Sequence, residues 1–319
     1  MIAPSRRRVL AGAAAATALP VLGCTEDRAR TARAGSASPR LVMWGAALMA
    51  HPLQTRLDAV AQSGFTHMTV FPADVARWRG GGMSDRQITR AIRASGVGIA
   101  TIDPYTGWVP GWSLEGLDDF TRDFIGYSEE EVFAMAETLE TEQVNCVESA
   151  GAPYDQNAYA DALAAFAERA SAHGLATTLE FMPTSKITDL AAGWSLIEAS
   201  GAGVGLTFDT WHFWRSDPDH ALLASIPMER IVEVQVADAD ETITGDLQMD
   251  LLYHRKPPGE GDFDLDRTMA VLRGMGPIRS IGPETFSEEM NATPAAEAVR
   301  RNAEGLAAVV PTLAADLRW

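Results

Sequence analysis

The chain has 319 residues, of which 46% are hydrophobic, and it carries a formal net charge of −17. This length suits one large domain, because a barrel of eight β/α units takes about 250 residues. A strongly negative surface repels phosphodiester backbones, so the charge argues against a nucleic acid partner or substrate.

The first 23 residues have the pattern of an export signal. A twin-arginine motif lies at 5–8, and an Ala-rich apolar run follows at 9–23. This run is shorter than the roughly 20 residues of a transmembrane helix and suits the core of a signal peptide. Because 21–24 resembles a lipobox, we expect 1–23 to be a twin-arginine, lipoprotein-type signal peptide and Cys24 to carry a lipid anchor. The expected location is the periplasm or cell envelope, with the membrane contacted only through this anchor.

The segment 24–39 is rich in Ala, Arg, Ser and Thr and is predicted to be a flexible tether. Beyond it, apolar runs that resemble strands alternate eight times with segments of helical spacing. The expected strands lie at 41–45, 68–71, 97–102, 144–147, 175–180, 204–209, 231–235 and 280–284. The expected helices lie at 52–63, 84–95, from 128, 158–173, 189–200, from 217, 264–274 and from 293 to about 310.

Eight β/α units fit a closed barrel better than an open sheet, and no Gly-x-Gly-x-x-Gly follows the first expected strand. We therefore predict one (β/α)8 TIM-barrel catalytic domain over 40–319. Two connections, 103–127 and 238–262, are unusually long. They could cover an active site or form contacts in a homo-oligomer.

Polar side chains end four consecutive strands of the predicted barrel. These side chains are Glu180, Asp209, Gln235 and Glu284. The carboxyl ends of parallel strands share one face, so the four groups should converge. Three carboxylates that meet in a dry place repel one another unless a cation lies between them. A set of oxygen ligands suits Mn²⁺, with Mg²⁺ or Co²⁺ as alternatives, so we predict one divalent metal ion here.

Five motifs in this order resemble the sugar phosphate isomerase/epimerase superfamily, whose barrels are xylose-isomerase-like. The motifs are Leu-Glu180-Phe, Phe-Asp209-Thr-Trp-His212, Val-Gln235-Val-Ala-Asp238, Arg255-Lys-Pro-Pro-Gly259-Glu-Gly261 and Pro-Glu284. The resemblance covers roughly 40–310. The superfamily includes ketose 3-epimerases, hydroxypyruvate isomerase and keto-inositol dehydratase.

The resemblance implies that the same four residues bind the metal. It also implies that Glu180 and Glu284 are catalytic, one removing a proton from carbon and the other returning it from the opposite face. The third ligand is commonly histidine in ketose epimerases, and Gln235 is closer to the hydroxypyruvate isomerase pattern. Because glutamine takes up no proton, we expect this site to hold its metal over a wider acid range than a site with a histidine ligand.

Five further residues are predicted to contact the substrate. Family resemblance places His212 beside the substrate, three residues after a metal ligand, and Arg255 is expected to point at substrate oxygens. Asp238 either orients Arg255 or caps the loop that follows it. Glu148 follows the fourth expected strand and could reach the site, and Trp211 could stack on a sugar ring.

The leading hypothesis is a metal-dependent isomerase or epimerase that acts on a ketose-like carbohydrate through a metal-stabilised enediolate. The first alternative is a lyase or dehydratase acting on a keto-sugar, keto-inositol or 3-keto-glycoside, since both reactions begin with proton removal next to a carbonyl. The second is a non-catalytic, lipid-anchored carbohydrate-binding protein. Endonucleases of this superfamily use a histidine-rich zinc cluster, which the six histidines of this acidic chain do not supply.

Overall fold

The computed structural model describes residues 38–201 and 203–317. The predicted signal peptide, the predicted anchor residue Cys24 and nearly all of the predicted tether lie outside these residues. Among the helices that are described, none combines the length and the apolar character needed to cross a lipid bilayer.

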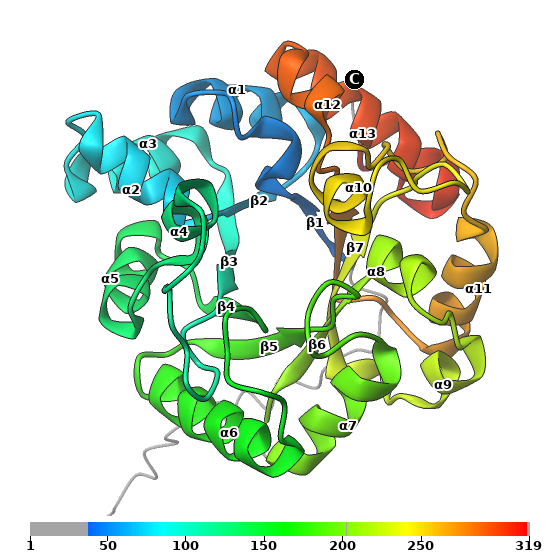
Figure 1. The fold of residues 1–319 in the computed structure, drawn as a ribbon. Coiled ribbons are helices and arrows are strands. Elements are labelled where there is room, and N and C mark those ends of the chain that lie inside the picture. Colours follow the sequence, from blue (N-terminus) through cyan, green and yellow to red (C-terminus); the bar gives the residue numbers. More distant parts are fainter. Residues whose placement is uncertain (1–37, 202, 318–319) are drawn as a thin grey trace, which may run out of the picture. The chain divides into compact units, whose positions relative to one another are not determined.

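Eight parallel strands close into a barrel in chain order, which confirms the predicted fold (Figure 1). The strands are β1 Arg40–Met43, β2 His67–Val70, β3 Gly98–Tyr105, β4 Gln143–Val147, β5 Ala176–Glu180, β6 Gly205–Asp209, β7 Ile231–Val236 and β8 Ser280–Pro283. Each strand pairs in parallel with the next, and β8 pairs with β1. All eight carboxyl ends therefore lie at one end of the barrel.

The longer helices surround the barrel and match the predicted ranges closely. They are α1 Leu53–Ser63, α3 Asp85–Ser95, α5 Glu129–Leu139, α6 Gln156–Ala172, α7 Leu190–Ser200, α11 Leu265–Met275 and α13 Ala295–Val309. Gly64 and Gly96 end α1 and α3 in the left-handed conformation, with φ of 89° and 74°. Ser128 and Glu131 form the predicted capping box of α5.

The helix predicted to begin at Asp217-Pro218 instead begins at His220. Asp219 caps it, because its carboxylate accepts hydrogen bonds from the backbone N–H groups of Ala221 and Leu222. Helix α9, His220–Ser225, is therefore short.

The sequence did not predict several helices of one to three turns. They are α2 Pro72–Gly80, α4 Asp119–Ile125, α8 Thr210–Arg215, α10 Leu247–Tyr253 and α12 Glu288–Ala292, with the 3₁₀ turns η1 Gly45–Leu48, η2 Met228–Arg230 and η3 Pro311–Leu313. Helices α4 and α10 lie within the two long connections. Most of these helices are too short to show a clear 3.6-residue period, so their caps carry most of the local signal.

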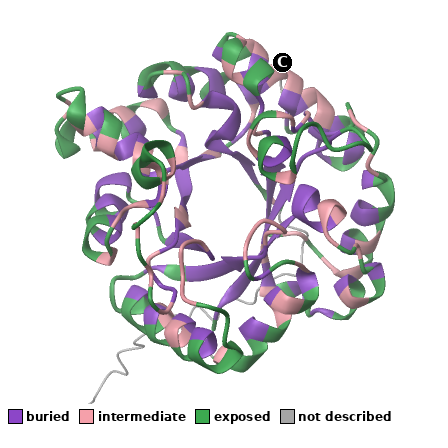
Figure 2. Ribbon diagram, viewed as in Figure 1, coloured by how far each residue is buried: buried purple, intermediate pink, exposed green. Residues whose placement is uncertain are grey.

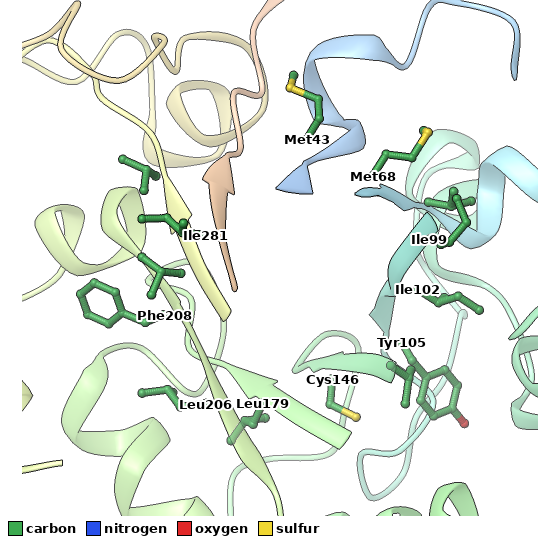
Figure 3. Close-up of a cluster of buried hydrophobic side chains, with 14 of the residues drawn as sticks. Met43, Met68, Ile99, Ile102, Tyr105, Cys146, Leu179, Leu206, Phe208 and Ile281 are labelled. Carbon is green, nitrogen blue, oxygen red and sulfur yellow. The ribbon is translucent and has the colours of Figure 1, made fainter. Parts of the chain in front are cut away.

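Side chains alternate between two surroundings along each strand. Met43, Leu179 and Phe208 point away from the barrel axis, into the apolar layer beneath the helices (Figure 3). The strands and the inward sides of the helices are buried, whereas the outer sides of the helices are exposed (Figure 2).

The side chains that point into the barrel are largely polar. Thr207 Oγ1 donates to Thr178 Oγ1 at 2.9 Å, and Thr178 Oγ1 donates to Asn145 Oδ1 at 2.9 Å. Glu233 is buried and neither carboxyl oxygen has a partner among the described residues. Burial raises the pKa of Glu233 to about 8, so this carboxyl is neutral at neutral pH. A chain of hydrogen bonds therefore runs from Thr207 through Thr178 and Asn145 to Glu180 at the carboxyl end of the barrel.

A buried ion pair joins α1 to α2. Arg56 donates to both carboxylate oxygens of Asp74, at 2.7 and 2.8 Å, and to the carbonyl oxygens of His51 and Met49. Arg56→Met should lower the free energy of unfolding by about 3–5 kcal/mol, because it leaves a buried carboxylate with the half-exposed Arg77 as its remaining cationic partner. Chemical denaturation measures this loss. Arg56→Met combined with Asp74→Leu should recover most of it, and equal losses in the single and double variants would contradict the argument.

Candidate functional site

The four predicted metal ligands lie together at the carboxyl end of the barrel. Glu180 and Asp209 are the last residues of β5 and β6, Gln235 lies in β7, and Glu284 follows β8. Asp209 pairs in register with Gln235, and Gln235 pairs with Gly282. All four side chains are buried, with 0–5% of each residue exposed.

The amide of Gln235 is held in one orientation. Its Nε2 donates to Asp103 Oδ2 at 3.2 Å and to Glu284 Oε1 at 3.3 Å. Its Oε1 is buried without a hydrogen-bond partner among the described residues. A buried acceptor without a partner is costly, and a cation beside it would satisfy it. The residues present therefore fit a bound divalent metal.

A guanidinium group lies among the carboxylates. Arg255 Nη1 donates to Asp209 Oδ2 at 2.8 Å and to Glu284 Oε2 at 3.1 Å. The same group lies between the rings of Trp211 and Phe286, 4.9 and 5.1 Å from their centroids. Trp211 is fully buried here and touches Arg255. The predicted substrate contacts of Arg255 and Trp211 stay predictions.

His212, which was predicted to contact the substrate, lies directly against two of the predicted metal ligands. Its Nε2 is 3.1 Å from Glu180 Oε1, and its backbone N–H donates to Asp209 Oδ1. Ligand atoms of these three residues all lie within 4.8 Å of one another, close enough to share an ion. Burial lowers the pKa of His212 to about 3, so its imidazole is neutral at neutral pH and able to bind metal.

The pKa values of the carboxyl groups are shifted in opposite directions. Burial raises the pKa of Glu180 well above its usual value, and the charges of Asp103 and Asp209 raise it further. Burial also raises the pKa of Glu284, against the opposing effect of Arg255. For Asp209, the effect of Arg255 and other neighbours exceeds that of burial, and the pKa falls below its usual value. Metal binding should therefore release protons from this cluster.

Two residues that the sequence analysis missed complete the cluster. Asp103 lies in β3, and burial raises its pKa to about 6. Asn145 lies in β4, and its Nδ2 donates to Asp103 Oδ1 at 2.9 Å and to Glu180 Oε2 at 2.6 Å. Asp103 carried the same signal as the predicted ligands, an apolar run that ends in a carboxylate. The expected third strand ends at Ile102 and leaves Asp103 in the connection, whereas β3 continues to Tyr105.

Two predicted substrate residues have other partners in the structure. Glu148 binds Lys186, with 2.9 Å to its Nζ and 2.6 Å to its backbone nitrogen. Asp238 accepts hydrogen bonds from the backbone N–H groups of Gly259 and Phe263. Of the two roles considered for Asp238, holding the loop after β7 matches these contacts.

A cavity of ≈ 140 Å³ opens onto the cluster. Its polar lining includes Asp103, Glu180, His212, Arg255 and Glu284. The rest of its wall is mainly apolar and includes Phe71, Phe120, Phe124, Leu251, Leu252 and Phe286. A larger hollow of ≈ 620 Å³ lies among the amino ends of the strands and contains none of these groups.

Replacing Gln235 by histidine tests its role. At about pH 7.5, Gln235→His should bind Mn²⁺ much as the parent chain does. At about pH 4 it should bind more weakly than the parent, because an imidazole takes up a proton and an amide does not, and burial places this step below the usual histidine pKa of about 6.5. Titration calorimetry at the two pH values measures this difference. The same pH dependence in both proteins would show that residue 235 does not bind the metal.

The sequence also matches curated enzymes. Over 253 residues it is 28% identical to a 3-dehydroshikimate dehydratase of Pseudomonas aeruginosa, a match that covers 76% of this chain and 37% of that protein. Over 141 residues it is 25% identical to an inosose isomerase of Halalkalibacterium halodurans, covering 43% of this chain and 49% of that protein. The chain thus spans less than half the length of the dehydratase.

The fold matches solved structures. A crystal structure of the IolI protein with a bound zinc atom superimposes with a TM-score of 0.72 and 18% sequence identity, covering 86% of this chain and 98% of that chain. This likeness shows the fold. The family model of the xylose isomerase-like TIM barrel matches residues 57–309. The chain therefore belongs to the xylose isomerase-like TIM barrel family.

Proposed function

We propose that this protein is a divalent-metal-dependent isomerase or epimerase that acts on a small ketose-like carbohydrate. The observation that carries this proposal is a pair of buried glutamates, Glu180 and Glu284, that line one cavity and both have raised pKa values. Groups that exchange protons with carbon near neutral pH need raised carboxyl pKa values. Two such groups at one cavity suit removal and return of a proton.

The metal would be held by Glu180, Asp209, Gln235 and Glu284, with His212 within reach. We favour Mn²⁺ because most of these donors are oxygens, although the nearby imidazole also suits zinc or cobalt. When bound, the cation would stabilise negative charge that develops on the substrate carbonyl oxygen.

The protein's own side chains would position the reacting groups. Asn145 fixes one oxygen of Glu180 by a hydrogen bond of 2.6 Å. Arg255 fixes Glu284 and is itself held between two aromatic rings. The phenylalanine-rich wall of the cavity would exclude bulk water and so strengthen these electrostatic interactions.

A dehydratase is the second candidate. The observation in its favour is the match to 3-dehydroshikimate dehydratase, which covers more of this chain than the match to inosose isomerase. Both reactions begin with proton removal next to a carbonyl. In the dehydratase, a hydroxyl group then leaves from the neighbouring carbon instead of the proton being returned.

Deuterium exchange distinguishes these candidates. The Mn²⁺-loaded chain is offered ketoses, inososes, 3-keto-glycosides and 3-dehydroshikimate in D₂O, and products are followed by NMR. Deuterium beside the carbonyl together with a new isomer would support the isomerase, and loss of water with a new carbon–carbon double bond would support the dehydratase. Neither exchange nor loss of water with any compound would reject both and leave the carbohydrate-binding alternative.

We also propose that the protein works outside the cytoplasm, tethered through Cys24. The support is the sequence at 5–24, with its twin-arginine motif, apolar run and lipobox-like end. Cys24→Ala should move the protein from the membrane fraction to the soluble fraction of fractionated cells. Equal partition of the variant and the parent chain would count against the anchor.

A further inference from the structure

A second hollow adjoins the small cavity at the carboxyl end of the barrel. This groove measures ≈ 600 Å³, and Phe120, Phe124, Leu252 and Phe286 line both it and the small cavity. The two spaces are therefore neighbours with a common wall.

Exposed apolar side chains gather at this groove. Phe120, Met249 and Tyr253 are 52%, 44% and 36% exposed, and all three line it. They are three of the five large apolar side chains that are exposed in the described part of the chain. Apolar side chains that are exposed together commonly mark a binding surface.

A row of aromatic rings leads from the groove to the reacting groups. Phe120 stacks on Phe124 with 6.0 Å between centroids, and Phe124 lies 5.0 Å from Phe71. Phe71 lies 5.8 Å from Phe286, whose ring faces the guanidinium of Arg255 at 5.1 Å. This apolar row ends at the arginine that binds two of the carboxylates.

Two helices build the outer walls of the groove. Helix α4 supplies Phe120 and Phe124, and α10 supplies Met249, Leu252 and Tyr253. They belong to the long connections after β3 and β7 and lie near the same opening of the barrel (Figure 1). Apolar residues from two segments that are distant in the sequence therefore line the opening of the barrel instead of packing in its core.

The two spaces differ in size and chemistry. The inner cavity has the volume of roughly five water molecules, which suits one sugar-sized ring. It presents carboxyl, imidazole and guanidinium groups, whereas the groove offers mainly aromatic and aliphatic surface. A substrate that fills both must have a polar head and an apolar extension.

We propose that the groove is a subsite for an apolar group, of the size of an aromatic ring, attached to the polyhydroxylated keto substrate. This inference rests on the proposed function, because it assigns the polar head to the inner cavity. The continuous wall between the spaces favours one bound molecule over a separate partner. A second copy of this chain is the other occupant that an exposed apolar groove could take.

Matched ligands test the subsite. The affinities of phenyl and methyl 3-keto-glucoside for the full, Mn²⁺-loaded chain are measured by titration calorimetry. The phenyl compound should bind at least tenfold more tightly, since its ring would bury apolar surface in the groove. In Met249→Ser/Tyr253→Ser this affinity ratio should fall to near one. The control Ile243→Ser, an equally exposed apolar residue outside the groove lining, should keep the ratio.

Several outcomes would overturn the subsite. The first is a ratio of phenyl to methyl affinity that is near one in the parent chain. The second is a ratio that does not change in Met249→Ser/Tyr253→Ser, and the third is no binding of either compound. A dimer in sedimentation that dissociates in the double variant would assign the groove to a second copy. Measuring deuterium exchange as well distinguishes failure of the subsite from failure of the proposed function. Exchange without a phenyl preference rejects the subsite alone, whereas a phenyl preference without any exchange rejects the proposed function alone.

Discussion

Glu180→Gln is expected to lower deuterium exchange next to the substrate carbonyl by about 10²- to 10⁴-fold, the usual contribution of a general base. An amide takes up no proton, whereas its size matches that of the carboxyl group. The variant should fold, because burial and nearby charges raise the pKa of Glu180 and so already favour its neutral form in the metal-free protein, which the amide resembles in size and charge. NMR in D₂O measures the exchange, and circular dichroism checks the fold.

Glu198→Gln is the matched control, since Glu198 lies on the exposed side of α7. It should exchange substrate protons at the parent rate. Metal content must be compared as well, because Glu180 is also a proposed ligand. If Glu180→Gln binds Mn²⁺ and retains the parent rate, Glu180 is not the base and the proposed mechanism fails.

Arg255→Met is expected to lower the stability of the metal-free protein strongly. The buried guanidinium binds both Asp209 and Glu284, and its removal leaves Asp209 without this partner. Breaking a buried ion pair in this way costs about 3–5 kcal/mol of the free energy of unfolding. Chemical denaturation of the metal-free protein near neutral pH measures this loss. Adding Mn²⁺ should recover part of it, because the cation would compensate the same carboxylates.

The loss of stability in Arg255→Met should depend on pH. With Arg255 present, the pKa of Asp209 is lowered, so the ionised carboxylate stabilises the fold above its usual pKa and loses this effect as the pH falls. Without Arg255, burial raises that pKa, and the carboxyl destabilises the fold increasingly as the pH rises. The difference between variant and parent should therefore be largest near neutral pH. It should decrease toward about pH 4, where the carboxyl of the variant takes up a proton, and disappear only as the pH falls through the lowered pKa of Asp209 in the parent. Arg267→Met, at an exposed position of α11, is the control, and a pH-independent loss would contradict this explanation.

Much of the fold could be predicted because its signals are local. Each strand is a short apolar run, and residues such as Gly64, Gly96 and Ser128 mark the ends of helices by their backbone conformation or their caps. The alternation of side chains along a strand also fixes which residues face the interior, as for Phe208 and its neighbour Asp209. A parallel barrel then brings strand ends to one face without further information.

The sequence by itself therefore determined the barrel and the convergence of Glu180, Asp209, Gln235 and Glu284. Only the tertiary structure decided how these groups are paired. Arg255 reaches Asp209 across 46 residues and Asn145 reaches Glu180 across 35, and no local pattern encodes such contacts.

The same holds for the walls of the site. Helices α4 and α10 are too short to show a period, and their apolar residues resemble those of a core in sequence. Whether such a residue faces the core or an opening depends on where two long connections meet in space. Local backbone preferences therefore determine the elements and their ends, whereas the packing of distant segments determines charge pairing, burial and the shape of the cavity.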